Sequence, residues 1–205
     1  MMLEKIALTG RVLGILLYAP PESQECQECQ PLLAMLQDPQ WVAEWPYEGC
    51  QQAAALIAEG MADNQPETLA EAYQRLFVGP YALPAPPWGS VYLDKESVLF
   101  GDSTLRLRQW LRVNGIEAQR DHNEPEDHIG TLLMMAAWLA EEQQQAMVTG
   151  LLAEHVLPWA PRYLELLQQH AGHPFYQGLA QLAQATLTAW AADCSAPVVK
   201  LDLYY

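Results

Sequence analysis

Apolar residues recur at helical spacing along almost the whole chain, and no segment of any length alternates between apolar and polar residues as a strand would. The first stripe, with Ile6, Leu13 and Leu17 on one face, predicts a helix that stops at Pro20-Pro21. With 205 residues, of which 51% are hydrophobic, the chain is long enough to bury one large core. The sequence therefore predicts an all-α fold, a single-domain helical bundle that spans residues 1–205.

Proline and glycine set the expected helix boundaries in the middle of the chain. Pro66 is well placed to start a helix that ends at Gly79-Pro80. Either Asp102 or Ser103 can cap the next helix, which Asn114-Gly115 should end. These boundaries leave residues 79–102 as a long loop between two helices.

The most apolar helix is expected after a capping motif. Asn123 with Glu126 resembles a capping box, and residues 129–140 are apolar nearly all round. Such a helix is typical of the buried centre of a bundle. A further helix should begin at Pro174, and the tail from residue 196 to 205 is too short to be a domain.

Residues 79–102 combine proline with aromatic side chains. Four prolines fall within eight positions, from Pro80 to Pro87, and Trp88 and Tyr92 follow them. Flexible linkers are poor in aromatic residues, whereas a proline-stiffened loop can present a large apolar side chain at a small entropic cost. We therefore expect an ordered loop that holds a ligand. The alternative, that Trp88 fills the core beneath the loop, stays open.

A cluster of polar residues precedes the most apolar helix, where Glu124, Glu126 and Asp127 are followed by His128. Acidic residues at the start of a helix are stabilised by its dipole, so ordinary capping is one interpretation. The spacing of His128 to the apolar residues after it predicts that its ring points inward. The other interpretation is a recognition groove with an aromatic wall and an acidic rim. The wall would contain Leu76, Phe77, Pro87, Trp88 and Tyr92, and the rim Glu124, Glu126 and Asp127.

The charge of the chain restricts its partners. There are 25 acidic against 10 basic residues, a formal net charge of -15, and the basic residues are scattered. A nucleic acid or an anionic membrane would be repelled, whereas a cationic peptide would be attracted. The apolar run at residues 12–19 is too short to cross a bilayer and lacks a cleavage site. We therefore expect a cytoplasmic protein with no nucleic-acid partner and no stable membrane insertion.

Catalytic and metal-binding signatures are weak. Cys26 and Cys29 form a C-x-x-C pair, but a structural zinc site needs a second pair of ligands at suitable spacing. The sequence has no nucleophile elbow and no glycine-rich phosphate loop. We expect neither catalysis nor a metal. The remaining enzyme alternative is a hydrolase that uses the cluster from Glu124 to His128.

Several long motifs resemble the TorD/DmsD/NarJ family of all-helical chaperones for molybdenum oxidoreductases. They are GPYALPAPPWGSVYLDKESVLFGDS from residue 79, NEPEDH at 123–128, RVLG at 11–14, QRLFVGP at 74–80, MAAWLAE at 135–141 and HPFYQGL at 173–179. The resemblance implies a cytoplasmic proofreading chaperone. Such a chaperone binds the twin-arginine signal peptide of a dimethyl sulfoxide reductase-like catalytic subunit and delays its export by the Tat pathway until the cofactor is loaded.

The resemblance also implies peptide-binding residues, which coincide with the groove. They are Tyr73, Leu76, Phe77, Pro87, Trp88, Tyr92, Gly101, Asp127 and His128. The DmsD branch carries tryptophan at the positions of Tyr73 and Tyr92, so a paralogous molybdoenzyme is an alternative client. Tat translocase components are further partners that the resemblance suggests. Some relatives bind guanine nucleotides, for which this sequence offers no signal of its own, and we expect no other cofactor.

Overall fold

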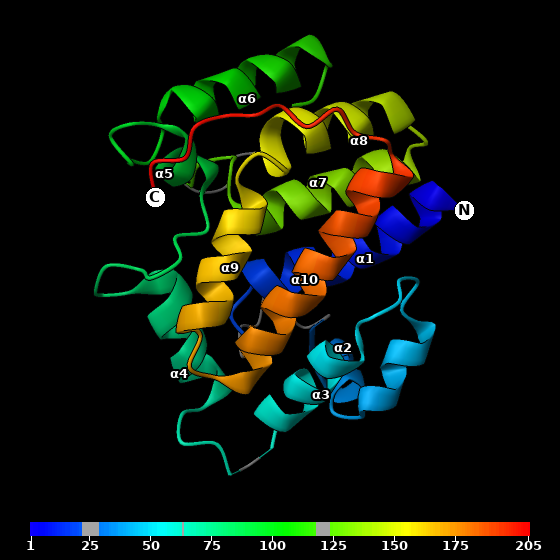
Figure 1. Ribbon diagram of the computed structural model, residues 1–205, viewed down its shortest axis with the longest axis vertical. Coiled ribbons are helices and arrows are strands. Elements are labelled where there is room, and N and C mark those ends of the chain that lie inside the picture. The colour runs from blue at the N-terminus through cyan, green and yellow to red at the C-terminus, as the bar shows by residue number, and fades with distance from the viewer. Residues whose placement is uncertain (22–28, 63, 118–123) are drawn as a thin grey trace. The chain divides into compact units, whose positions relative to one another are not determined.

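The structure, a computed structural model, describes residues 1–21, 29–62, 64–117 and 124–205 (Figure 1). The described residues form helices, and their β-type pairing is limited to an antiparallel bridge between Trp88 and His128. This confirms the all-α prediction. Cys26 and Asn123 lie outside the described residues.

The described chain divides into two compact units. Unit 1 comprises Met1–Gly14, Pro87–Ala160 and Ala191–Tyr205, and unit 2 comprises Ile15–Pro86 and Pro161–Trp190. Helices α1 (Met2–Tyr18), α9 (Ala160–His170) and α10 (Pro174–Asp193) contribute residues to both units. The single-domain organisation stays a prediction.

Unit 1 contains most of the segments that the sequence marked as functional. Its other elements are α5 (Gly89–Leu93), α6 (Asp102–Val113), α7 (Ile129–Glu141), α8 (Gln145–Leu151), the π-helical turn η4 (Leu152–Val156) and the extended tail after α10. Helix α7 is buried along most of its length, as predicted. Gly14 lets α1 approach it closely, because a Cβ at Gly14 would lie 2.5 Å from Cγ of Met134 and 2.9 Å from the carbonyl oxygen of Gly130.

Unit 2 is built around α10 and the helices that precede the proline-rich loop. Its other elements are α2 (Cys29–Leu36), the 3₁₀ helix η2 (Pro39–Glu44), α3 (Gln51–Gly60), α4 (Leu69–Tyr73) and the π-helical turn η3 (Gln74–Val78). Gly178 on α10 faces α3, where an added Cβ would lie 2.5 Å from the carbonyl oxygen of Ala53. Close packing of helix backbones therefore shapes the cores of both units.

Several predicted helix ends are confirmed. Helix α1 ends at Tyr18, just before Pro20-Pro21, and Pro174 begins α10. The turn η3 ends at Val78 with Gly79 as its C-cap, and the φ of 108° at Gly79 suits glycine. Helix α6 ends at Val113 with Asn114 as its C-cap, followed by Gly115 at a φ of 70°.

Three predicted helix starts are wrong, and in each case a different group caps the helix. Helix α4 begins at Leu69, after Pro66, because Thr68 and Glu71 form a capping box. The N-cap of α6 is Gly101, and not Asp102 or Ser103.

The third wrong start concerns α7, which does not open at the Asn123–Glu126 motif. It begins at Ile129, with His128 as its N-cap. Glu126 and Asp127 form a turn before it, and the His128 amide donates to the carbonyl oxygen of Pro125 at 3.4 Å.

Candidate functional site

The proline-rich loop and the acidic segment meet in unit 1. We call this meeting point the junction and define it as residues 87–92 together with residues 125–130. The Gly89 amide donates to the Asp127 carbonyl oxygen at 3.1 Å, and the Ile129 amide donates to the Pro87 carbonyl oxygen at 2.8 Å. Main-chain hydrogen bonds thus hold together two segments that the sequence marked separately.

Gly89 begins α5 at a position where no side chain fits. A Cβ there would lie 2.8 Å from Nε1 of Trp159 and 2.9 Å from its Cε2. The Trp159 ring also stacks on Tyr92 with ring centroids 5.4 Å apart, and both rings are fully buried. The start of α5 therefore rests directly on a buried aromatic pair.

Asp127 is buried and is bound by the start of α5. Its Oδ2 accepts a hydrogen bond of 2.6 Å from the Ser90 amide. Burial raises the pKa of Asp127, while hydrogen bonds from Ser90 and Thr104 lower it. Oδ2 is thus bound within the chain, and Oδ1 is buried without a hydrogen-bond partner among the described residues. This burial corrects the expectation that Asp127 lies on an exposed rim.

His128 is the N-cap of α7, and its ring points inward as predicted. Its Nδ1 accepts a hydrogen bond of 3.1 Å from the Gly130 amide, so the neutral ring carries its proton on Nε2. Burial lowers the pKa of His128 to about 3. The ring is therefore neutral near pH 7 and caps the helix as an acceptor.

Trp88 lies beside this ring. Its indole meets the His128 imidazole edge to face, with centroids 5.6 Å apart. Trp88 is half-buried, and its Nε1 is buried without a hydrogen-bond partner among the described residues. The structure therefore supports part of each interpretation of Trp88, because the indole packs on the junction and also reaches the surface.

Glu126 pairs with a cation of its own chain. Nε of Arg108 donates to Oε2 of Glu126 at 2.8 Å, and the guanidinium lies 5.4 Å from the ring centre of Phe100. Glu126 is buried, whereas Glu124 is half-buried. The predicted acidic rim is thus wrong for Glu126 and Asp127, because both carboxylates are used inside the junction.

Gly101 has a packing role at the start of α6. Asp94 accepts hydrogen bonds from the Ser103 amide at 3.1 Å and from the Ser103 hydroxyl at 2.6 Å. A Cβ at Gly101 would lie 2.8 Å from Cγ of Asp94. Glycine at this position therefore leaves room for the carboxylate that binds the first turn of α6.

The other three predicted site residues lie in unit 2. The Tyr73 hydroxyl donates to the carbonyl oxygen of Tyr18. The Tyr73 ring stacks on Phe77 at 4.9 Å, and Phe77 meets Tyr176 at 5.4 Å. All three predicted residues, Tyr73, Leu76 and Phe77, are buried. They belong to a packed aromatic cluster at the π-helical turn η3, a conformation that often marks functional positions.

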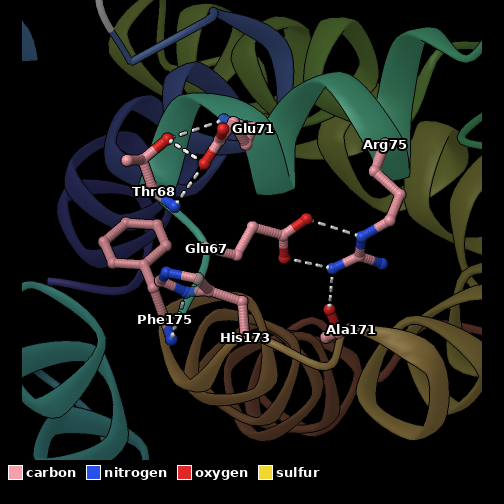
Figure 2. A network of polar contacts seen from close by, with 7 residues as sticks. All are labelled: Glu67, Thr68, Glu71, Arg75, Ala171, His173 and Phe175. Carbon is pink, nitrogen blue, oxygen red and sulfur yellow. Dashed lines mark hydrogen bonds and ion pairs between the residues drawn. The ribbon is translucent and has the colours of Figure 1, made fainter. Parts of the chain in front are cut away.

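A polar network, which the sequence analysis missed, supports this turn (Figure 2). Arg75 donates to both carboxylate oxygens of Glu67, at 2.8 and 2.6 Å, and to the carbonyl oxygen of Ala171 at 2.7 Å. Nδ1 of His173 accepts a hydrogen bond from the Phe175 amide at 3.3 Å. Arg75 lies within the motif QRLFVGP and His173 within the motif HPFYQGL. These motifs were the sequence signal that could have pointed to the network.

The structure thus places eight of the predicted residues in unit 1 and three in unit 2. Six of them lie in the junction, namely Pro87, Trp88, Tyr92, Glu126, Asp127 and His128. Glu124 precedes the junction, and Gly101 lies at the start of α6. The peptide-binding role of these residues stays a prediction. Among the described residues, no three His, Cys, Asp or Glu side chains gather in a way that could hold a metal ion. No described helix is both long and apolar enough to cross a membrane.

Comparison with known proteins identifies the family. Residues 45–165 match the family described as nitrate reductase delta subunit. The chain is 52% identical over 201 residues to the Tat proofreading chaperone DmsD of Salmonella typhi, covering 98% of this chain and 96% of the relative. It is 40% identical over 206 residues to the probable Tat proofreading chaperone DmsD of Haemophilus influenzae, with 98% of each chain covered. It is 28% identical over 191 residues to the chaperone protein YcdY of Escherichia coli, covering 91% of this chain and 94% of the relative.

The chain therefore belongs to the nitrate reductase delta subunit family, which includes the TorD and DmsD chaperones. This confirms the family inferred from the motifs. These relatives are chaperones and not enzymes, which favours a binding protein over the hydrolase alternative.

Proposed function

We propose that this protein is a proofreading chaperone that binds the twin-arginine signal peptide of a dimethyl sulfoxide reductase-like molybdenum enzyme. It retains the client in the cytoplasm until maturation is complete and then releases it for Tat export. The observation that carries the proposal is the 52% identity, over nearly the full length of both chains, to a protein named Tat proofreading chaperone.

The physical properties of the chain support binding of such a peptide. A twin-arginine leader offers two guanidinium groups followed by an apolar stretch. The formal charge of -15 attracts the arginines at long range, and the half-buried Trp88 supplies an aromatic surface for the apolar part. Because Glu126 and Asp127 already have partners within the chain, Glu124 is the better candidate for an arginine contact in this segment.

Co-purification tests this function. The full chain should retain a reporter protein that carries the leader of a dimethyl sulfoxide reductase-like subunit, and it should not retain the same reporter without the leader. Replacing both leader arginines with glutamine should weaken the retention. Equal recovery of all three reporters would contradict a leader-binding chaperone.

A paralogous molybdoenzyme is the alternative client. It is favoured by the resemblance, which sets Tyr73 and Tyr92 of this chain against tryptophan in the DmsD branch, because tyrosine offers a smaller aromatic surface with a polar end. Titration of the protein with leaders from several molybdoenzyme classes distinguishes the two clients. The leader of the true client should bind with the highest affinity.

A further inference from the structure

The carboxyl-terminal tail, residues 196–205, follows α10 and lies extended across unit 1. Figure 1 shows this segment in red, running past α6 and ending beside α5. The Val199 amide donates to the Ala153 carbonyl oxygen at 3.0 Å, and the Tyr204 amide donates to the Tyr92 carbonyl oxygen at 2.9 Å. The tail is thus attached at one point to η4 and at another to α5.

The tail is apolar and yet remains partly exposed. Its large apolar side chains keep between 40% and 43% of their surface accessible: Val198, Val199, Leu201, Leu203, Tyr204 and Tyr205. A segment that is packed into a core would expose far less. The tail therefore lies on the surface of the unit like a bound peptide.

The tail covers Tyr92, which the family resemblance assigns to peptide binding, and it shares a small pocket with Asp127, which has the same assignment. The Tyr205 ring meets the Tyr92 ring edge to face, with centroids 5.5 Å apart, and Tyr92 is fully buried. Leu201 lines a small pocket with Gly89, Asp127 and Trp159. An incoming peptide can reach Tyr92 from this side only after the tail has moved.

A larger hollow is lined in part by the tail. It has a volume of about 490 Å³ and is lined by Trp110 of α6, by His155 of η4 and by Val199 and Leu201 of the tail. Nε2 of His155 is buried without a partner among the described residues. The walls of the hollow are mostly apolar, and Arg106, Gln109 and Glu154 add polar groups beside His155. This lining suits an extended chain that carries both apolar side chains and main-chain amides.

We propose that the tail occupies a peptide channel in the free protein and that the apolar stretch of the client leader takes its place. This inference rests on the proposed function and adds a mode of regulation to it. The tail resembles that stretch chemically. Four of its residues 198–203 are Val or Leu, and the other two are Lys200 and Asp202. When the tail occupies the channel, the leader can bind only to the molecules in which the channel is free. The apparent affinity for the leader is therefore the intrinsic affinity multiplied by that fraction of molecules.

Two matched variants test the competition. Tyr205→Ala removes the ring that covers Tyr92, so the channel should be free in more of the molecules. The affinity for the leader should then rise by about threefold or more. Tyr204→Ala is the control, because it removes a neighbouring tyrosine side chain and retains the amide that donates to Tyr92. Its leader affinity should change much less. Equal or weaker leader binding by Tyr205→Ala would overturn the inference.

Hydrogen exchange on the unmodified protein provides a second measurement. The amides of Val199 and Tyr204 should be protected in the free protein and lose protection when the leader saturates it, while amides of α8 remain protected. Leader binding with undiminished tail protection would overturn the inference and leave the proposed function intact. Failure of the leader to bind at all would overturn both.

Discussion

His128 joins three features of the junction in one side chain. Its main chain pairs with Trp88, its Nδ1 caps α7, and its ring packs against the Trp88 indole. The sequence predicted the inward direction of this ring from helical spacing, although the residue precedes the helix. It could not predict the cap, because histidine is not among the preferred N-cap residues.

The buried ring should make stability depend on pH. The pKa of His128 is about 3 in the folded protein and about 6.5 when exposed, so its stabilising contribution is complete above pH 6.5 and is lost as the pH falls toward 3. His155, whose pKa burial lowers to about 4, acts in the same direction. The variant His128→Asn keeps a capping oxygen but cannot titrate. Its free energy of unfolding should therefore decrease less than that of the wild type as the pH falls.

Urea unfolding at two pH values measures this effect. Between pH 6.5 and 5, the difference in free energy of unfolding between wild type and His128→Asn should narrow by about 2 kcal/mol. Parallel pH profiles of the two proteins would show that His128 remains protonated, or accessible to water, in the folded state.

Trp88 should contribute more to leader binding than to folding. Because the indole is half-buried, Trp88→Ala should weaken leader binding by about 2 kcal/mol and lower the melting temperature only modestly. The fully buried Trp159 is the control, since Trp159→Ala should cost about 3–5 kcal/mol of folding stability. Calorimetric titration and thermal melts separate the two effects. A Trp88→Ala protein that loses stability as Trp159→Ala does, with unchanged leader affinity, would identify Trp88 as a core residue.

At the scale of helices and turns, the sequence predicted where most of the long helices lie but not how several of them begin. The stripes of α1, α6, α7 and α10 follow from local periodicity and from proline and glycine. The first turn of α6 is bound by Asp94 and the start of α5 by Asp127, and each carboxylate comes from outside its helix. Such caps depend on tertiary contacts, so local pattern alone could not predict them.

The same limit applies to the candidate site. The motifs identified the right segments, and the structure shows that the proline-rich loop and the acidic segment are bonded to each other. Sequence patterns could not show that Glu126 and Asp127 are buried. An acidic residue near the start of a helix gives the same sequence pattern whether its carboxylate faces solvent or accepts a hydrogen bond from within the protein. Nor could they show that the tail, which is too short to be a domain, covers Tyr92.

The π-helical turn η3 should depend on the Arg75 network. Arg75→Lys keeps the positive charge but loses the two-pronged contact with Glu67, so we expect a loss of about 1 kcal/mol in folding stability. Arg162→Lys is the matched control, because Arg162 makes an exposed pair with Glu165 within one helix and should change stability very little. Chemical denaturation measures both. Equal effects of the two substitutions would show that the network adds nothing beyond a surface ion pair.

For the molecule as a whole, the acidic excess should set the salt dependence of leader binding. Charges on protein and leader attract over distances that salt screens, with a Debye length of about 8 Å at physiological ionic strength. Affinity for the leader should therefore fall as sodium chloride rises, mainly through slower association. Stopped-flow measurements over a range of salt concentrations show whether the association rate changes. A rate independent of salt would mean that the net charge of -15 only keeps the protein soluble.

The most direct test of the account is a calorimetric titration of the full chain with the twin-arginine leader and with the same leader carrying glutamine in place of both arginines. We predict saturable binding of the leader, weaker binding of the glutamine form, and a smaller salt dependence for the glutamine form. Identical affinities and salt responses for the two peptides, or no binding of either, would contradict a chaperone that recognises the twin-arginine signal.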